Sequence, residues 1–242
     1  MKFAENDYEH IHSNMLKILK YIHKILTQNN IFYSLACGSV LGAVREKGFI
    51  SWDLDADIFI LIEDREKIRY LLKEALPSEF YYEDSSINNI SSHDDISFVY
   101  KKTVFSVDIY PLFGFPEAIS DQQKFIRKCK IVNKLFSCKY SDVRRVRNKL
   151  KWPIFMCLKI IEKLIPNSFF RKKIIKLENQ NKNSNLISYM ALDGRIEEIF
   201  EKEVLKDTIL VMFEDTFLSI PKQYDFYLSK VYGEDYMTPR RY

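Results

Sequence analysis

The chain has 242 residues, of which 47% are hydrophobic and 29% are charged, as expected of a globular protein that buries one core or two small ones. No apolar run is long enough to span a bilayer, and the N-terminus lacks the apolar region of a signal peptide, so we expect a cytoplasmic protein. The four cysteines show neither zinc-ligand spacing nor a disulfide framework and are interpreted as buried thiols.

The first elements alternate between helix and strand. Apolar residues recur at helical spacing from Ile11 to Leu26 and stop at the pair Asn29-Asn30, which predicts an opening amphipathic helix. After it we expect a strand over 31–38, a short helix over 39–48 with Ser39 as its N-cap, a strand over 55–63 and a helix over 64–76.

A second group of strands follows, and then the pattern becomes helical. Residues 80–84, 95–102 and 104–114 alternate as strands do, with a tight turn near Lys101 to Thr103. From Ser120 onward the spacing is helical, with breaks at Trp152-Pro153 and Pro166-Asn167 and a polar loop over 179–185. We therefore predict an α/β (α+β) core over 1–115 and a mainly helical part over 116–242.

Positive charge is concentrated in the middle of the chain. Residues 127–176 hold sixteen Lys and Arg but two acidic residues, a net charge of +14, so the rest of the chain carries −10 of the overall +4. Such asymmetry suggests contact with a polyanion or an anionic surface, although solvated helix faces give the same pattern. Residues 139–165 join basic residues to an amphipathic stretch, which either lies on an anionic membrane or packs inward as a core helix.

The stretch "SWDLDADIFI" places carboxylates at every second position directly before an apolar strand. Side chains at i and i+2 of a strand share a face, so Asp55 and Asp57 stand side by side and repel unless a cation lies between them. An EF-hand loop is excluded, because its sixth position requires glycine and Ile58 stands there. Two such carboxylates can instead hold Mg²⁺ or Mn²⁺ on a phosphate.

Two further segments fit a phosphoryl-transfer site. Asp108 lies between Val107 and Ile109, so it faces away from the core if they face toward it, and it is the candidate for a third metal ligand. Gly38 and Ser39 lie between a strand and a helix N-terminus, where backbone N–H groups favour a phosphate.

The run "GSVLGAVREKGFISWDLDADI" resembles the signature of the LicD family, whose usual form is Gly-Thr-Leu-Leu-Gly-Ala-Val-Arg-x-x-Gly-Phe-Ile-Pro-Trp-Asp-Asp-Asp-x-Asp-Ile. "VDIYPL" is similar to the family's second acidic motif, and "VMFEDTFLSIPKQYDFYLSKVYGEDYM" to its C-terminal block. Leu54 replaces an acidic residue and Ser51 a proline, and the first departure bears on metal or donor preference. The resemblance implies a nucleotidyltransferase-like mixed sheet flanked by helices.

The resemblance also implies a function. Members transfer phosphocholine from CDP-choline to a sugar of a surface glycan, with fukutin-type ribitol-phosphate transferases as distant relatives. It maps the catalytic metal carboxylates onto Asp55, Asp57 and Asp108, the phosphate turn onto Gly38 and Ser39, and a donor-binding arginine onto Arg45. The implied partners are a CDP-linked donor and a glycan acceptor, which could be lipid-linked at the inner face of a membrane.

Three other residues have both a functional and a structural interpretation. Asp53 shares the parity of the carboxylate pair but also suits a turn-capping role. Trp52 could stack on a base or on choline, whereas a tryptophan beside a strand is more commonly a buried anchor. Glu214 is a candidate because it belongs to the "FE" pair of the C-terminal block.

Two other functions remain open at this point. A nucleotidyltransferase of the same superfamily would add a nucleoside monophosphate to a small molecule or to RNA. The basic middle lacks the spaced aromatic platforms of single-strand binders, which argues against nucleic acid. A non-catalytic module that binds a glycan or a membrane surface is disfavoured by the intact set of Asp55, Asp57 and Asp108.

Overall fold

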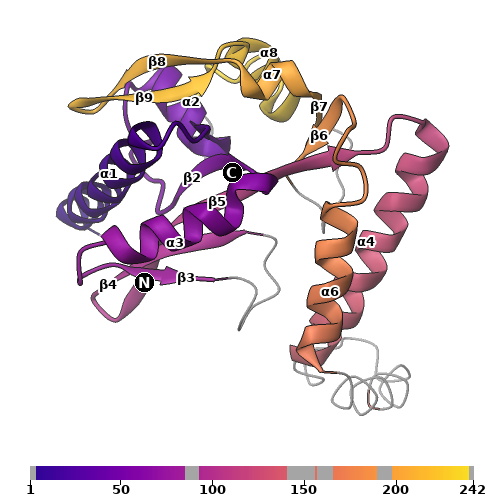
Figure 1. The fold of residues 1–242 in the computed structure, drawn as a ribbon. Helices are drawn as coiled ribbons and strands as arrows, with labels where there is room; N and C mark the ends of the chain where they lie inside the picture. The colour runs from indigo at the N-terminus through magenta and orange to yellow at the C-terminus, as the bar shows by residue number, and fades with distance from the viewer. Residues whose placement is uncertain (1–3, 85–92, 141–155, 157–165, 190–197, 240–242) are drawn as a thin grey trace.

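The computed structural model describes residues 4–84, 93–140, 156, 166–189 and 198–239 (Figure 1). Its centre is a mixed sheet with the strand order β1 (Tyr33–Leu35), β2 (Ala56–Leu61), β5 (Thr103–Phe115), β4 (Asp94–Tyr100) and β3 (Tyr81–Glu83). Strands β2 and β5 are parallel, and the other neighbours are antiparallel. This mixed sheet flanked by helices confirms the predicted fold class.

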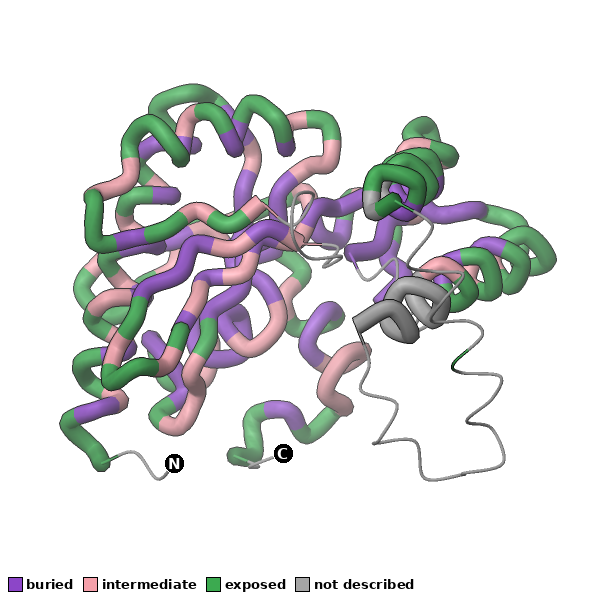
Figure 2. Tube along the Cα trace, turned by 90° about the horizontal axis from the view of Figure 1, so that it is seen from below, coloured by how far each residue is buried: buried purple, intermediate pink, exposed green. Residues whose placement is uncertain are grey.

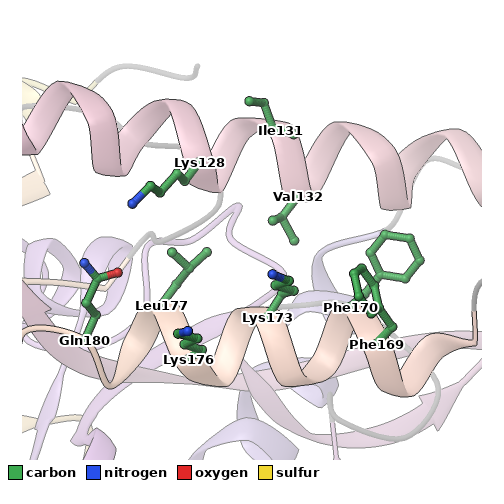
Figure 3. A pocket seen from close by; sticks show the side chains of 9 residues that line it. All are labelled: Lys128, Ile131, Val132, Phe169, Phe170, Lys173, Lys176, Leu177 and Gln180. Carbon is green, nitrogen blue, oxygen red and sulfur yellow. The ribbon is translucent and has the colours of Figure 1, made fainter.

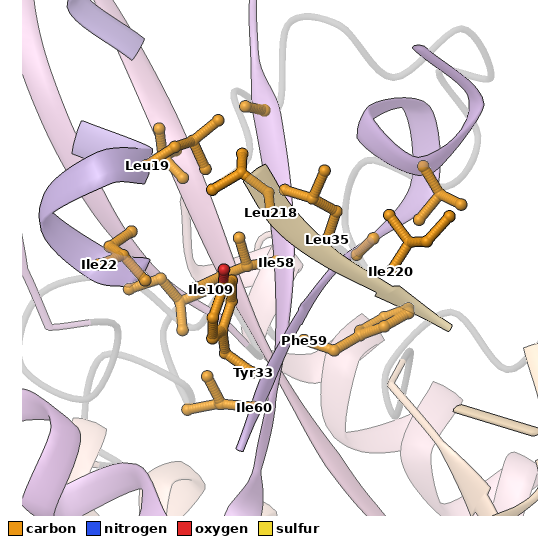
Figure 4. Close-up of a cluster of buried hydrophobic side chains, with 14 of the residues drawn as sticks. Leu19, Ile22, Tyr33, Leu35, Ile58, Phe59, Ile60, Ile109, Leu218 and Ile220 are labelled. Atoms are coloured by element: carbon orange, nitrogen blue, oxygen red, sulfur yellow. The ribbon is translucent and has the colours of Figure 1, made fainter. Parts of the chain in front are cut away.

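Helix α1 (Glu5–Gln28) covers one side of the sheet, as its apolar spacing predicts. It contacts β4, β5 and helix α3 (Arg65–Ala75). Figure 4 shows Leu19 and Ile22 of α1 beside Ile58 and Ile109 of the sheet. The helix ends at Gln28, and Asn30 then adopts the left-handed conformation with φ 52°. In Figure 2 the buried residues, drawn in purple, lie mainly along the strands at the centre of the molecule.

Helix α2 (Cys37–Arg45) begins two residues earlier than the sequence predicts. Its N-cap is Ala36, so the prediction of Ser39 as the cap is wrong. The physical reason is that strand β1 ends at Leu35 and the chain turns sharply at Cys37, which has a φ of 44°. The Ser39 hydroxyl is then free to accept a hydrogen bond from the backbone N–H of Asp57, at 2.9 Å.

A buried group of ion pairs joins helix α3, strand β4 and a later helix, α6 (Asn167–Glu178). Arg65 of α3, which follows the short helix η1 (Ile62–Asp64), and Arg69 both contact the Asp94 carboxylate of β4, at 3.1 and 2.7 Å. Arg65 also approaches Glu178 at the end of helix α6, at 3.4 Å. Tyr82 donates a further hydrogen bond to Asp94. Because Asp94 and Glu178 are buried, these pairs fix α3 and α6 against the sheet.

The part after residue 116 contains strands as well as helices. Helices α4 (Ile119–Tyr140) and α6 pack side by side (Figure 1). Strand β6 (Leu186–Ser188) pairs with the C-terminal end of β5, and β7 (Ile199–Glu201) pairs with β6. Helix α7 (Lys202–Lys206), the hairpin β8 (Thr208–Phe213) and β9 (Thr216–Pro221), and helix α8 (Tyr224–Tyr232) complete the chain.

The prediction of a helical pattern from Ser120 onward was therefore incomplete. Strands β6 and β7 have three residues each; β6 pairs with β5 and β7 pairs with β6, and local spacing does not reveal such partners. Of the basic stretch 139–165, residues 141–155 and 157–165 lie outside the described residues, and so does the predicted break at Trp152-Pro153. In the part of the chain that the structure describes, no helix is both long and apolar enough to cross a membrane.

Candidate active site

The strand register brings acidic residues from four strands into one row. Asp57 of β2 lies opposite Asp108 of β5, which in turn lies opposite Asp95 of β4. Asp95 lies opposite Glu83 of β3. Residues that face each other across neighbouring strands project from the same side of the sheet, so these four side chains share one face. The row runs across the sheet on the side opposite α1, since the neighbouring Val107 and Ile109 are buried in the core.

Asp57 is the most buried member of the row. Its carboxylate accepts a hydrogen bond from the backbone N–H of Gly38, and its own backbone N–H donates to Ser39. Burial raises the pKa of the Asp57 carboxyl well above its usual range, and the charges of Asp55 and Asp108 raise it further. The N-terminal turn of α2 therefore positions a carboxyl group whose ionised form requires a nearby cation.

Asp53 and Asp55 lie in the loop that leads into β2. Burial and the charge of Asp55 raise the pKa of Asp53 to about 7, and Asp53 also accepts a hydrogen bond from the N–H of Leu54. Both interpretations of Asp53 are thus compatible with its contacts, because it caps the turn and also interacts with its acidic neighbour. Asp55 is exposed to solvent, so a ligand can reach it.

Gly38 allows the Asp53 carboxylate to lie against the start of α2. A Cβ atom on Gly38 would come within 3.0 Å of Asp53 Oδ2. On the other side of the loop, His12 of α1 contacts the Asp53 carbonyl oxygen at 2.9 Å and stacks on Phe49. The acidic loop is therefore held from both sides, and the contact with His12 was not predicted from the sequence.

Asp108 has its own set of polar neighbours. The Ser106 hydroxyl donates to Asp108 Oδ1 at 2.7 Å, and His93 Nε2 lies 3.4 Å from Asp108 Oδ2. Burial raises the pKa of Asp108, although His93 and the hydrogen bonds from Ser106 and Tyr110 oppose the change. Burial likewise lowers the pKa of His93. The ring of His93 packs on Tyr110, with the two centroids 4.6 Å apart.

Asp95 was missed in the sequence, although a signal for it was present. The tight turn at Lys101 and Lys102 pairs Tyr100 with Thr103, and this register places Asp95 opposite Asp108. Burial and the charges of Glu83 and Asp108 raise the pKa of Asp95 to about 7. The row therefore continues past Asp57 and Asp108 to Asp95 and Glu83, which the motifs did not predict, whereas Asp55 lies in the loop before β2.

The remaining candidates lie around the acidic loop. Arg45 contacts Glu46 at 2.8 Å and donates to the carbonyl oxygen of Tyr236 at 3.3 Å, so it ties α2 to the C-terminal segment. Trp52 is half-buried and packs against the main core. Glu214, in the turn between β8 and β9, accepts a hydrogen bond from the Phe49 N–H at 3.0 Å.

Glu214 also holds this loop by a second contact. Its backbone N–H donates to the Lys47 carbonyl oxygen at 2.7 Å, and its side chain fills the space in which a Cβ on Gly48 would lie. These contacts place Glu214 at the loop that precedes the acidic residues, and the structure does not bring it into the carboxylate row.

Tyrosine rings surround the buried end of the site. Tyr227 of α8 accepts a hydrogen bond from the Cys37 N–H at 3.0 Å, and Tyr189 packs on Phe59 with the centroids 4.7 Å apart. Burial is the largest cause of the raised pKa of Tyr232, to which Asp53, Asp55 and Asp57 also contribute. Among the described C-terminal aromatic residues, Tyr227 and Tyr232 approach the site, whereas Phe217 and Phe226 are exposed.

Asp55, Asp57 and Asp108 offer the ligand chemistry that a hard divalent cation prefers, because all three are carboxylates whose charges act on one another. The raised pKa values of Asp57 and Asp108 fit a site in which a cation offsets their mutual repulsion. As they stand, no three His, Cys, Asp or Glu side chains among the described residues converge closely enough to hold an ion.

Comparison with known proteins bears on residues 30–136, which match the family described as LicD/FKTN/FKRP, nucleotidyltransferase domain. The lipopolysaccharide cholinephosphotransferase LicD of Haemophilus influenzae is 47% identical over 45 residues, which are 19% of this chain and 17% of that protein. Uncharacterized proteins of Rickettsia prowazekii and Rickettsia typhi are each 39% identical over 61 residues, 25% of this chain and 23% or 20% of theirs. The match thus spans less than a quarter of the length of these relatives.

Proposed function

We propose that this chain, whose residues 30–136 match the LicD/FKTN/FKRP nucleotidyltransferase-domain family, transfers a phospho-substituent from a cytidine diphosphate donor to a sugar hydroxyl of a cell-surface glycan. CDP-choline is the proposed donor. The observation that carries the proposal is the strand register, which sets Asp57 beside Asp108 with Asp55 in the adjoining loop.

The three carboxylates of Asp55, Asp57 and Asp108 would hold Mg²⁺ or Mn²⁺. A bound ion of this kind neutralises phosphate oxygens and stabilises the charge that develops on them during phosphoryl transfer. Gly38 and Ser39 hold Asp57 in position through the hydrogen bonds described above, and the exposed Asp55 is accessible to the donor.

Asp108 is the candidate for accepting the proton of the sugar hydroxyl. The acceptor oxygen forms a bond to the β-phosphorus, the bond from that phosphorus to the bridging oxygen breaks, and cytidine monophosphate leaves with the electron pair. The hydroxyl proton passes to the Asp108 carboxylate, which Ser106 orients through its 2.7 Å hydrogen bond. Asp57 is less suited to this task, because its carboxylate is buried and already bonded to Gly38.

The aromatic side chains near the carboxylates favour a donor with a cationic headgroup. A quaternary ammonium makes no ordinary hydrogen bond and is held by the faces of aromatic rings. Tyr110 and Tyr232 are half-buried; burial raises the pKa of both phenols, and the charges of the nearby Asp55 and Asp57 raise it further. They are the candidates for contact with choline.

The test is incubation of the purified protein with Mg²⁺, CDP-choline and a panel of glycan acceptors, with chromatography of the nucleotide product. We expect release of cytidine monophosphate, its loss on addition of EDTA, and its loss in Asp57→Asn. Asp121→Asn is the matched control, because Asp121 is an exposed residue of α4 that pairs with Lys124. Release of pyrophosphate from CTP, with CDP-choline left intact, would instead establish a nucleotidyltransferase.

A further inference from the structure

A groove runs between helices α4 and α6 (Figure 3), and none of its lining residues belongs to the carboxylate row. Its volume is about 460 Å³, within the range of roughly 300–1,000 Å³ that small-molecule sites occupy. From α4 it is lined by Lys128, Ile131 and Val132, which recur at helical spacing and so share one face. From α6 it is lined by Phe169, Phe170, Lys173, Lys176 and Leu177, with Gln180 just beyond the helix.

The floor of the groove is apolar and continues into the interior. Phe170 is buried, and Leu177 belongs to the small core formed with Phe113 and Phe125, against which Val132 packs. At the mouth, Ile131 and Phe169 remain 59% and 48% exposed. The groove therefore presents apolar surface to the outside that neither α4 nor α6 covers.

The rim of the groove is positively charged. Lys128, Lys173 and Lys176 are exposed residues on its two sides, and none of the nine lining residues is acidic. Figure 3 shows the lysines among the apolar side chains, and Lys173 Nζ lies 5.6 Å from the centre of the Phe169 ring. An occupant that satisfies both features has an apolar chain and an anionic head.

We propose that this groove takes an alkyl chain of an anionic phospholipid, with the lipid phosphate among Lys128, Lys173 and Lys176, and that this contact docks the protein on an anionic membrane surface. Basic residues beside exposed Phe and Ile are the composition of an interfacial docking surface. The surface differs from residues 139–165, which were predicted from the sequence as the membrane contact. It does not depend on the proposed transferase activity.

Charge favours a lipid over a second copy of the chain. A symmetric dimer through this groove would set the lysine rim of one copy against the same rim of the other. The three lysines would then face one another without any acidic side chain from the groove to offset them. Lipid phosphates supply the missing negative charge, and their chains cover the exposed Ile131 and Phe169.

The experiment is cosedimentation of the full chain with vesicles of phosphatidylcholine, alone or with about 30% phosphatidylglycerol, at low and high salt. Wild-type protein is expected to bind the anionic vesicles at low salt and to bind phosphatidylcholine weakly. We expect at least about tenfold weaker binding in the triple variant Lys128→Glu, Lys173→Glu and Lys176→Glu, because each basic residue near an anionic leaflet contributes to the binding free energy.

Two controls separate the groove from general surface effects. The changes Lys17→Glu, Lys24→Glu and Lys67→Glu alter the net charge equally at exposed positions of α1 and α3, and they should retain most of the binding. The pair Ile131→Ser and Phe169→Ser should weaken binding without lowering the melting temperature, whereas Leu210→Ser and Phe217→Ser, equally exposed on the β8–β9 hairpin, should not weaken it.

Three results would overturn the proposal. The first is absence of binding to the anionic vesicles at low salt, and the second is equal loss in the two lysine triples. The third is full binding by the Ile131→Ser and Phe169→Ser variant, since the alkyl chain would then play no part. Light scattering measures the oligomeric state in parallel. A wild-type dimer that is lost in the Ile131→Ser and Phe169→Ser variant would assign the groove to a second copy of the chain.

Discussion

A buried carboxylate beside other carboxylates lowers stability unless a cation accompanies it. Asp57 is such a group, because burial and the charges of Asp55 and Asp108 raise its pKa. Between the pKa of an unfolded aspartate, near 4, and the raised pKa in the fold, the native protein binds more protons than the unfolded chain. Its stability without metal therefore falls as the pH rises through this window.

Asp57→Asn removes this charge and keeps an oxygen that can accept from the Gly38 N–H. We expect the variant in EDTA to melt at a higher temperature than the wild type at pH 8, and to show a shallower fall between pH 5 and pH 8. The rate of the proposed transfer should drop on the order of a thousandfold, because one of the proposed ligands of the metal ion is lost. Thermal melts across this pH range, with Asp121→Asn as control, test the first part, and an unchanged pH slope would refute it.

Glu214 differs from Asp57 in that its contacts hold the backbone of a loop. The Phe49 N–H donates to its carboxylate, so Glu214→Ala should cost about 1 kcal/mol of unfolding free energy, the usual loss for one hydrogen bond. Glu214→Gln keeps an acceptor oxygen and should retain both stability and rate. Urea unfolding and initial rates distinguish the two roles, because a glutamine variant that folds normally but lacks activity would make Glu214 catalytic.

At the scale of elements, the pairing of β2, β5, β4 and β3 builds the carboxylate row, and α2 fixes its most buried member. The alternation of buried Val107 and Ile109 with Asp108 could be predicted from the sequence, and it is what the strand shows. The N-cap of α2 could not be predicted from the sequence, because Ala36 is held by a hydrogen bond from its N–H to the Asp57 carbonyl oxygen on the neighbouring strand. Local capping preferences do not include such a long-range contact.

Arg65 of α3 links helix α6 to the sheet, because it contacts both Glu178 of α6 and Asp94 of β4. Asp94 carries contacts from Arg65 and Arg69, which hold the pKa of its carboxyl well below the usual range despite burial. Asp94→Asn leaves two buried guanidinium groups without their main counter-charge and should cost about 3–5 kcal/mol of unfolding free energy. Urea unfolding at pH 7 measures the loss, with Asp121→Asn expected to change it by less than about 0.5 kcal/mol.

The pH dependence of this contribution has a defined sign. Because the folded pKa of Asp94 is lowered, its stabilisation is present above the pKa of an unfolded aspartate, near 4, and is lost as the pH falls toward the lowered value. The difference between the wild type and Asp94→Asn should therefore shrink in acid. A difference that stays constant from pH 7 to pH 3 would contradict the buried ion-pair account.

At the scale of the whole molecule, the mixed sheet was anticipated from the family resemblance, and Asp57 and Asp108 lie on neighbouring strands as expected. Asp55 was expected on the same strand as Asp57 but lies in the loop that precedes β2. The neighbours that complete the site come from distant segments. His12 reaches Asp53 from α1, and Tyr227 reaches Cys37 from α8, 190 positions away. Such contacts depend on how helices pack on the sheet, which spacing within a single segment does not encode.

The central claim is that Asp55, Asp57 and Asp108 act together as one cation-binding group. The most direct test is titration of the protein with Mn²⁺, followed by the electron paramagnetic resonance signal of the free ion, with and without CDP-choline. Each single change to Asn should weaken binding by at least about tenfold, on the scale that loss of one ligand contributes, whereas Asp121→Asn should bind as the wild type does. Mn²⁺ affinities that are equal in the wild type and all three variants would contradict the account.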